Sequence, residues 1–252
     1  MGTLTDMLRP CVSSVSHCKV CSAKAPLYGV TDFNKNCEEA KGVYLPLTGV
    51  PVHYYQCSRC GLVFTIAFDH WSTSDFREHI YNERYVTVDP DYVEARPAAN
   101  ADMIADFIKK SQSLACLDYG GGNGTLTTLL RHRGIDAHSW DPVANHEDAC
   151  PTGSFDFVSA FEVLEHTPEP LATVEQALGF LREGGVMLFS TNVFDHVPTR
   201  SMDHWYIAPR NGHITIHTKP SLQALFARFG YRVHHFNDNF HLALKSVPAW
   251  LS

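Results

Sequence analysis

The run Leu117-Asp118-Tyr119-Gly120-Gly121-Gly122-Asn123-Gly124 places an acidic residue and a glycine-rich turn between two segments of different periodicity. Residues 113–117 lack polar alternation, which is typical of a strand buried on both faces of a parallel sheet. Residues 125–133 read as a helix. Glycine allows the positive φ angles of so tight a turn, and the free N–H groups at a helix start face a ligand. The run therefore predicts an α/β fold with a ligand at the turn.

An aspartate at the end of the next expected strand indicates what kind of ligand this is. Residues 135–141 form that strand, and its last residue, Asp141, lies about 20 residues beyond the turn, where an acid commonly holds a ribose diol. A dinucleotide fingerprint has its third glycine where this chain has Thr125. Asp118 would also repel two phosphates, whereas it can accept hydrogen bonds from an ammonium group. The residues therefore favour a nucleoside cofactor whose nearer end is cationic.

This pattern resembles the first motif of class I S-adenosylmethionine-dependent methyltransferases, Asp-x-Gly-x-Gly-x-Gly, which residues 118–124 match without a gap. Residues 155–166, Phe-Asp-Phe-Val-Ser-Ala-Phe-Glu-Val-Leu-Glu-His, resemble the fourth motif of the small-molecule branch that includes ubiquinone-biosynthesis enzymes. The resemblance covers residues 98–245 and implies a Rossmann-like sheet that binds S-adenosylmethionine. It implies Asp118, Gly120 and Gly122 around the methionine part, Asp141 at the ribose and Phe161 near the sulfonium, and Asn123 and Glu162 are further candidates. In the aromatic segment before the domain, Tyr85 or Tyr81 is expected to close over the cofactor.

One part of the family sheet is expected to be missing or vestigial. Only residues 142–154 separate Asp141 from the next expected strand, and they are poor in apolar residues. A crossover with its own helix needs at least about 10–12 residues of suitable sequence. We therefore expect no full third strand or preceding helix, and Asp148 and Ala149 are the nearest candidates for an adenine pocket.

The remaining elements of the sheet follow from periodicity and glycines. Apolar residues at helical spacing predict one helix around residues 103–108, one over 171–181 that ends at Gly184-Gly185, and one over 222–229. Residues 186–190 are expected as the fifth strand. Residues 231–236 and 240–245 read as a hairpin that gives the mostly parallel sheet an antiparallel last strand.

Two Cys-x-x-Cys pairs near the amino terminus predict a metal site. Cys18 and Cys21, with Cys57 and Cys60, can place four thiolates around one structural zinc ion at tetrahedral geometry. Gly61 allows the turn that directs backbone N–H groups at sulfur. The residues between the pairs, 22–56, are expected to hold loops or a hairpin.

The other cysteines bear on alternative ligands and on the redox environment. Cys37, His17 and His53 are alternative zinc ligands, and Cys116 is expected to be a core residue of the first strand. Redox-active pairs are a further alternative. Residues 1–10 do not resemble a signal peptide, so we expect a reducing cytoplasm and not a disulfide framework.

The four cysteines and the following Gly61-Leu62-Val63-Phe64 resemble the amino-terminal zinc segment of several methyltransferases of sugars and natural products. The chain of 252 residues is long enough for one α/β domain and a small module. The expected division is a zinc-binding module at 1–64, a linker or lid at 65–97 and a methyltransferase domain at 98–252.

Charge and hydropathy exclude some classes of partner. Lys and Arg total 20 against 27 Asp and Glu, which gives a formal net charge of −7. No basic stripe of the kind that binds nucleic acid is visible, and no apolar run has the length that crosses a bilayer. A small-molecule or saccharide acceptor is the expected partner, and the oligomeric state is left open.

Methyl transfer to a hydroxyl group needs an in-line approach, dry surroundings and removal of a proton. Histidine is the natural base, and His166, at the end of the fourth motif, and His213, in a polar loop after the fifth strand, are the candidates, with Glu165 beside them. Glu162-x-x-Glu165-His166 also resembles a cluster with which small-RNA terminal methyltransferases and some ubiquinone-pathway enzymes bind a divalent ion, and His213 would complete it.

The predicted function is therefore transfer of a methyl group from S-adenosylmethionine to oxygen, or less often to carbon or nitrogen, of a metabolite or sugar. Two alternatives from other classes are a nicotinamide-dependent oxidoreductase and a non-catalytic, zinc-containing interaction protein.

Overall fold

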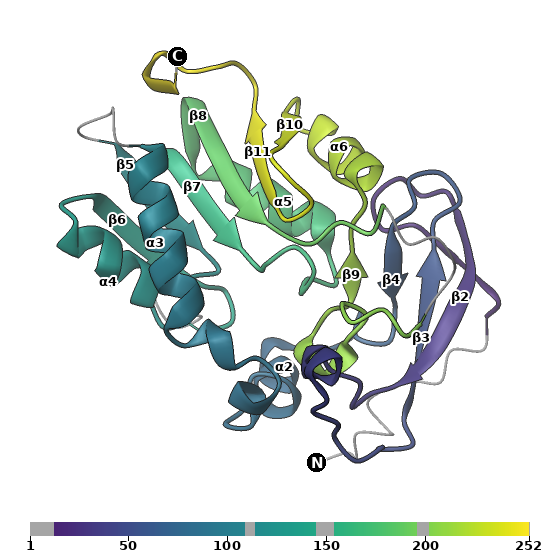
Figure 1. Ribbon diagram of the computed structural model, residues 1–252. Coiled ribbons are helices and arrows are strands. Elements are labelled where there is room, and N and C mark those ends of the chain that lie inside the picture. The colour runs from purple at the N-terminus through teal and green to yellow at the C-terminus, as the bar shows by residue number, and fades with distance from the viewer. Residues whose placement is uncertain (1–12, 109–113, 145–153, 196–201, 252) are drawn as a thin grey trace. The chain divides into compact units, whose positions relative to one another are not determined.

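The computed structural model describes residues 13–108, 114–144, 154–195 and 202–251, and these form two compact units (Figure 1). The first unit combines Met1–Asp89, Leu164–Thr173 and Asn192–Leu225. The second combines Pro90–Val163, Val174–Thr191 and Phe226–Ser252. Both units are thus built from separate stretches of the chain. The expected division at residues 64 and 97 stays a prediction.

A six-stranded sheet organises the second unit, in the order β10-β11-β8-β7-β5-β6. Four strands are parallel, and β11 runs antiparallel to β8 and pairs with β10 in a hairpin, as predicted. Among the described residues no strand pairs on the far side of β6; the expected loss of the family's third strand concerns residues 142–154, of which 145–153 lie outside the described residues, so it stays a prediction. The bounds are β5 Ala115–Tyr119, β6 Asp136–Trp140, β7 Phe155–Phe161, β8 Leu181–Ser190, β10 Arg232–His235 and β11 Phe240–Leu244.

Helices cover both faces of this sheet. On one face, α3 (Ala95–Phe107) and α4 (Thr125–His132) share a core with buried side chains of β5, β7, β8 and β11. Cys116 belongs to this core, as predicted. On the other face, Tyr119 donates a hydrogen bond to Gln176 of α5 (Pro170–Gly179), and Phe226 of α6 (Lys219–Ala227) stacks on Phe189 of β8. This double layering buries the parallel strands on both faces, which explains their continuous apolar sequence.

One expected boundary is wrong. The helix predicted to end at Gly184-Gly185 ends at Gly179, and β8 already begins at Leu181, opposite Phe155. The pairing then shifts register, so that Val186 is the next residue opposite the partner strand, at Phe157. Gly184 has a φ of +77° inside this irregular stretch. The two glycines therefore allow a bulge in a strand and do not end a helix.

The first unit contains an antiparallel sheet in the order β1-β2-β3-β4-β9. The segment between the cysteine pairs forms the expected hairpin, because β2 pairs with β3. Residues 65–97 hold α2 (Thr73–His79), the 3₁₀ helices η2 (Tyr85–Thr87) and η3 (Pro90–Tyr92), and the start of α3. The sheet bounds are β1 Val15–His17, β2 Lys24–Asp32, β3 Pro51–Gln56, β4 Val63–Thr65 and β9 Thr215–Ile216.

The fifth strand of this sheet comes from a distant part of the chain. β9 pairs with β4, with Val63 opposite Ile216 and Phe64 opposite Thr215. Ile214 and Ile216 are fully buried in the core of the first unit, together with Tyr54 and Phe68. The segment after β8 is therefore an integral part of the amino-terminal sheet.

In the described part of the chain, no helix is long and apolar enough to cross a membrane.

Candidate functional site

The glycine turn after β5 is packed so tightly that side chains are excluded at two of its positions. Gly120 has a φ of +75°, and a Cβ atom there would lie 2.5 Å from Cγ2 of Val163. Gly121 needs no positive φ, but its Cβ would lie 2.3 Å from Oγ of Ser139 and 2.6 Å from Oδ2 of Asp118. The sequence prediction named Gly120 and Gly122 and missed Gly121. The motif spacing gave no signal for Gly121, because its constraint comes from the side chains beneath the loop.

Asp118 lies buried under this turn. Ser159 of β7 donates a hydrogen bond of 2.9 Å to Oδ1 of Asp118. Burial raises the pKa of Asp118 to about 7; the Ser159 bond lowers it, and the nearby Asp141 carboxylate raises it. Oγ of Ser139 is also buried, without a hydrogen-bond partner among the described residues. A cationic amino group would stabilise the charged form of Asp118, so these residues fit a ligand with an ammonium group at this turn.

Asp141, at the carboxyl end of β6, holds the turn through backbone N–H groups. Its Oδ2 accepts a hydrogen bond of 2.9 Å from Gly122, and its Oδ1 accepts bonds from Val143 at 2.7 Å and Ala144 at 2.8 Å. A carboxylate offers about four acceptor positions, so about one is left for a ribose hydroxyl. Asp141 thus fits the expected role and also fixes the glycine turn.

The other predicted cofactor residues lie in several places. Asn123 accepts hydrogen bonds from the N–H and the hydroxyl of Thr125 at the start of α4. Half-buried Phe161 packs edge-on against Phe240. Tyr85 lies in the first unit, where its hydroxyl donates to the Asn211 carbonyl. Asp148 and Ala149 lie outside the described residues.

Glu162 has an unusual backbone conformation directly after β7. Its φ is +53°, a region that non-glycine residues rarely adopt and that stores strain. Ser190 of β8 stabilises it, because its Oγ donates to Glu162 Oε1 at 2.7 Å and accepts from the Glu162 N–H at 3.0 Å. Strain of this kind is common at functional sites, and no sequence pattern signals it.

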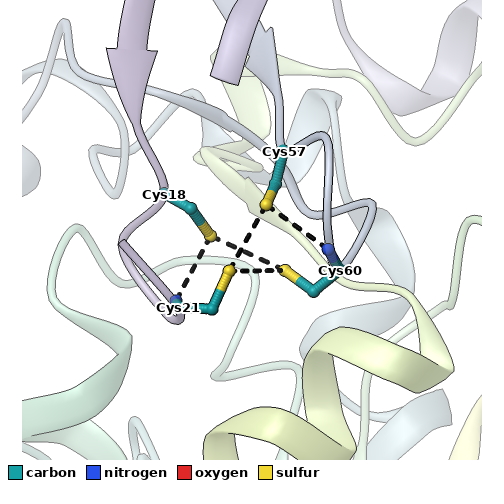
Figure 2. Close-up of side chains that lie close together, drawn as sticks. All are labelled: Cys18, Cys21, Cys57 and Cys60. Carbon is teal, nitrogen blue, oxygen red and sulfur yellow. Dashed lines mark hydrogen bonds between the residues drawn. The ribbon is translucent and has the colours of Figure 1, made fainter. Parts of the chain in front are cut away.

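The four predicted cysteines come together in the first unit (Figure 2). The Sγ–Sγ distances are 3.6 Å for Cys18–Cys60, 3.4 Å for Cys21–Cys57 and 3.8 Å for Cys21–Cys60. Zinc bound tetrahedrally at about 2.3 Å from each sulfur separates the sulfurs by about 3.8 Å. The cluster therefore has the size of a four-thiolate zinc site.

Backbone N–H groups support these sulfurs. Val20 and Cys21 donate to Sγ of Cys18, and Arg59 and Cys60 donate to Sγ of Cys57. Gly61, with a φ of +75°, makes the turn that follows the second pair, as expected. In the described part of the chain, the cluster does not include the alternative ligands Cys37, His17 and His53.

A second group of residues that could hold a metal ion lies in the first unit. Ligand atoms of Glu165, His166 and His213 all lie within 4.8 Å of one another. The expected set was Glu162, Glu165 and His166, with His213 to complete it. In the described part of the chain the cluster contains Glu165, His166 and His213, without Glu162. The ring centroids of His166 and His213 are 4.9 Å apart. One carboxylate and two imidazoles are a ligand set for a divalent transition metal.

Tyr206 orients two of these three residues. Its hydroxyl accepts a hydrogen bond from the Asn192 N–H at 3.0 Å and donates one of 2.6 Å to Glu165 Oε1. Its carbonyl lies 3.0 Å from Nδ1 of His213. Because a carbonyl only accepts, Nδ1 of His213 is the donor in this contact. Sequence reasoning noted Tyr206 only as part of an aromatic loop, since its partners are far away in the chain.

β9 anchors the Glu165 segment. The backbone N–H groups of Ile214 and Thr215 donate to the Glu165 carbonyl at 2.9 and 3.0 Å, and the Thr215 hydroxyl donates to the Thr167 carbonyl at 2.7 Å. Two residues after β9, the hydroxyl of Thr218 donates a hydrogen bond to the carbonyl of Cys60. Residues 214–218 therefore form hydrogen bonds both with the Glu165 segment and with the second cysteine pair.

Comparison with known families and structures gives consistent results. A family model described as a methyltransferase domain matches residues 92–236. The structure of an O-methyltransferase family protein from Burkholderia thailandensis matches with a TM-score of 0.53 at 17% identity, over 71% of this chain and 64% of that one. At this identity the likeness shows the fold alone.

Two curated relatives share the same name. The ubiquinone biosynthesis O-methyltransferase of Methylococcus capsulatus is 31% identical over 112 residues, which cover 34% of this chain and 47% of that protein. The protein of that name from Actinobacillus pleuropneumoniae serotype 5b is 37% identical over 46 residues, which cover 18% of this chain and 20% of that protein. The chain therefore spans less than half the length of these relatives.

Proposed function

The chain belongs to the family of methyltransferase domains, and from this premise we propose that it transfers a methyl group from S-adenosylmethionine to a hydroxyl group of a small-molecule or saccharide acceptor. The observation that carries the proposal is the buried Asp118 under a glycine turn that admits no side chain at Gly120 or Gly121. The printed names of the relatives support oxygen as the acceptor atom.

The residues of the second unit hold the cofactor in this proposal. Asp118 accepts hydrogen bonds from the methionine ammonium group, which stabilises its charged form against burial. Asp141 binds a ribose hydroxyl with its remaining acceptor position and keeps the turn closed through Gly122. Phe161 and Glu162 lie at the end of β7, where the fourth motif places the sulfonium. S-adenosylmethionine supplies a methyl group that is already activated by its positively charged sulfur.

His213 is the base that we propose for the acceptor hydroxyl. Its Nδ1 donates to the Tyr206 carbonyl, so Nε2 is the ring nitrogen that accepts the proton in this proposal. The His213 side chain is buried, 5% exposed, and the acceptor proton therefore leaves to nitrogen and not to bulk water. His166, whose ring is the immediate neighbour of His213, is the second candidate for this step.

The activity is tested with S-adenosylmethionine that carries a trideuteromethyl group, added with the full chain to a protein-free metabolite extract. Mass spectrometry should detect a labelled product with the wild type, much less with His213→Ala, and little with Asp118→Asn. Asp136→Asn changes an exposed aspartate of β6 and is the matched control. If no extract fraction gains the label with the wild type, or if Asp118→Asn labels as well as the wild type, the proposal is wrong.

We also propose that the four cysteines hold one structural zinc ion. Their sulfur separations and the four N–H···S contacts support this. Purified full chain should contain about one zinc per chain by elemental analysis. Cys57→Ser should lose it, whereas Cys116→Ser, in the other unit, should keep it.

A divalent ion at Glu165, His166 and His213 is a second candidate role for the same histidines. The convergence of the three ligand atoms supports it, as do the bond that the Tyr206 hydroxyl donates to Glu165 and the bond that the Tyr206 carbonyl accepts from His213, since metal-binding histidines usually donate their other N–H to a carbonyl or carboxylate. Chelated protein, with its zinc retained, should bind added Mn²⁺ with about one ion per chain, observed by electron paramagnetic resonance. Tyr206→Phe should weaken this binding about 10- to 100-fold. If His213→Ala binds Mn²⁺ like the wild type, His213 acts only as a base.

A further inference from the structure

A buried arginine in the first unit has no carboxylate partner in the part of the chain that the structure describes. Arg210 lies in the 3₁₀ helix η4 (Pro209–Asn211), and it is 5% exposed. Among the described residues, no acidic side chain forms an ion pair with it. Burial lowers the pKa of Arg210; Tyr85 opposes this effect, and the positive charge of Arg84 adds to it. Burial is therefore the main effect that disfavours the charged form of Arg210.

The protein acceptors of Arg210 are neutral. Nη1 donates to the Ile80 carbonyl at 3.0 Å, at the end of α2, and Nη2 donates to Oδ1 of Asn82 at 3.3 Å. These contacts explain why the side chain lies against the end of this helix. They use two of the five N–H donors of a guanidinium, and they leave its charge uncompensated. Buried charges in proteins are normally paired, because an unpaired one is costly.

The position of Arg210 connects it with the proposed chemistry. It precedes His213 by three residues, and Gly212 between them turns with a φ of +87°. A Cβ atom at Gly212 would lie 3.0 Å from Nδ1 of His166 and 3.2 Å from the Tyr81 hydroxyl. The turn that carries Arg210 is therefore packed directly against the histidine pair.

We propose that Arg210 binds an anionic group of the methyl acceptor, a carboxylate or a phosphate. The planar fork of the guanidinium matches both groups, and such an anion supplies the missing counter-charge. The acceptor is then held by its acidic group on the same turn that carries His213. The inference rests on the proposed function only in calling this ligand the methyl acceptor.

The test uses simple probes and needs no methyl transfer. Benzoate and benzamide have nearly the same shape and differ in charge, and inorganic phosphate represents the other anion. Calorimetry with the full chain should show benzoate or phosphate binding about 10- to 100-fold more tightly than benzamide, as expected for hydrogen bonds to a charged group. Whichever of benzoate and phosphate binds more tightly identifies the class of anion. If neither anion binds better than benzamide, the inference is wrong.

Asn82→Asp is the sharpest variant, because it places a carboxylate at an acceptor that Arg210 already contacts. It should lose anion binding and raise the melting temperature measured without anion. Asn82→Ala loses the same Asn82 bond to the Glu78 carbonyl, adds no charge, and should keep anion binding. Arg210→Gln should also lose anion binding. If Asn82→Asp binds benzoate and phosphate like the wild type, Arg210 is not their site.

S-adenosylhomocysteine distinguishes this inference from the proposed function. Its own carboxylate is an alternative anion for Arg210. If saturating S-adenosylhomocysteine leaves anion binding in place, the anion site belongs to the acceptor. If it displaces benzoate or phosphate by competition, Arg210 holds the cofactor and the inference is overturned. S-adenosylhomocysteine binding without any anion binding would contradict the inference and leave the methyltransferase proposal standing.

Discussion

Asp118 shows how burial changes the meaning of a motif residue. The motif predicts an acidic residue at the turn, but only the structure shows that its pKa rises from 3.8 to about 7, mainly because it is buried. Without a cation the folded chain therefore holds a proton on Asp118 that the unfolded chain releases near pH 4. Between these two pKa values the unfolded state binds fewer protons, so stability falls as the pH rises.

We expect the free energy of unfolding of the ligand-free wild type to fall between about pH 4 and pH 7, by about 1.4 kcal/mol per pH unit at most. Asp118→Asn cannot ionise and should show a flatter profile than the wild type, with a higher stability at pH 8. Urea unfolding from pH 5 to pH 8 measures both. Parallel profiles of the two proteins would mean that Asp118 is not protonated in the folded chain.

Binding of the cofactor should depend on pH in the opposite direction. An ammonium group stabilises the charged form of Asp118, so the affinity for S-adenosylhomocysteine should increase from pH 5.5 to about pH 7 and then level off. Calorimetry at several pH values measures this dependence. Asp118→Asn should bind S-adenosylhomocysteine weakly at every pH. If its affinity changes with pH as that of the wild type does, the pH dependence comes from another group.

Gly121 has no room for a Cβ atom although its φ is not positive. Its Cβ would lie 2.3 Å from the Ser139 Oγ and 2.6 Å from Oδ2 of Asp118, so Gly121→Ala should destabilise the chain by about 1–3 kcal/mol and weaken cofactor binding. Adding Ser139→Gly should restore part of the loss. Gly179→Ala, with open space around it, is the control. Chemical unfolding measures the free energy of unfolding of all three variants. If Gly121→Ala is as stable as the wild type, the close packing of Gly121 against Ser139 and Asp118 is wrong.

At the scale of elements, the sequence predicted the strands and helices that have a clear period. The glycine turn, α4, β6, β7 and the last hairpin agree with the structure within a few residues. The end of α5 was missed because Leu181 continues the helical spacing while its backbone pairs with Phe155. β9 was missed because a strand of two residues is too short to show an alternation of apolar and polar residues. Its pairing with β4 also joins positions about 150 residues apart in the chain.

The contact between β4 and β9 predicts the effect of metal removal. The second cysteine pair directly precedes β4, and Thr218 after β9 donates to the Cys60 carbonyl. Loss of zinc should therefore speed amide hydrogen exchange at residues 57–65 and at Thr215 and Ile216. Exchange in β5 and β7, in the other unit, should stay the same and is the internal control. Unchanged protection of β9 in zinc-free protein would show that the metal does not support this strand.

At the scale of the whole molecule, composition and motif order predicted an α/β methyltransferase sheet with four convergent cysteines. Residues 142–154 are too few and too polar for a full third strand and its helix, and this stays a prediction because residues 145–153 lie outside the described part of the chain. The interleaved composition of the two units was not predictable, because local periodicity does not report which distant segments share a core. The networks of Tyr206 and Arg210 escaped prediction for the same reason, since their partners come from several distant segments.

The central claim is that the turn after β5 selects a cationic nucleoside cofactor over a dinucleotide. Calorimetric titration of the zinc-loaded full chain with S-adenosylhomocysteine and, separately, with NAD tests it most directly. We expect one S-adenosylhomocysteine per chain, at least about tenfold weaker binding in Asp118→Asn, and no measurable NAD binding. Tighter binding of NAD, or S-adenosylhomocysteine binding that Asp118→Asn leaves unchanged, would contradict the account.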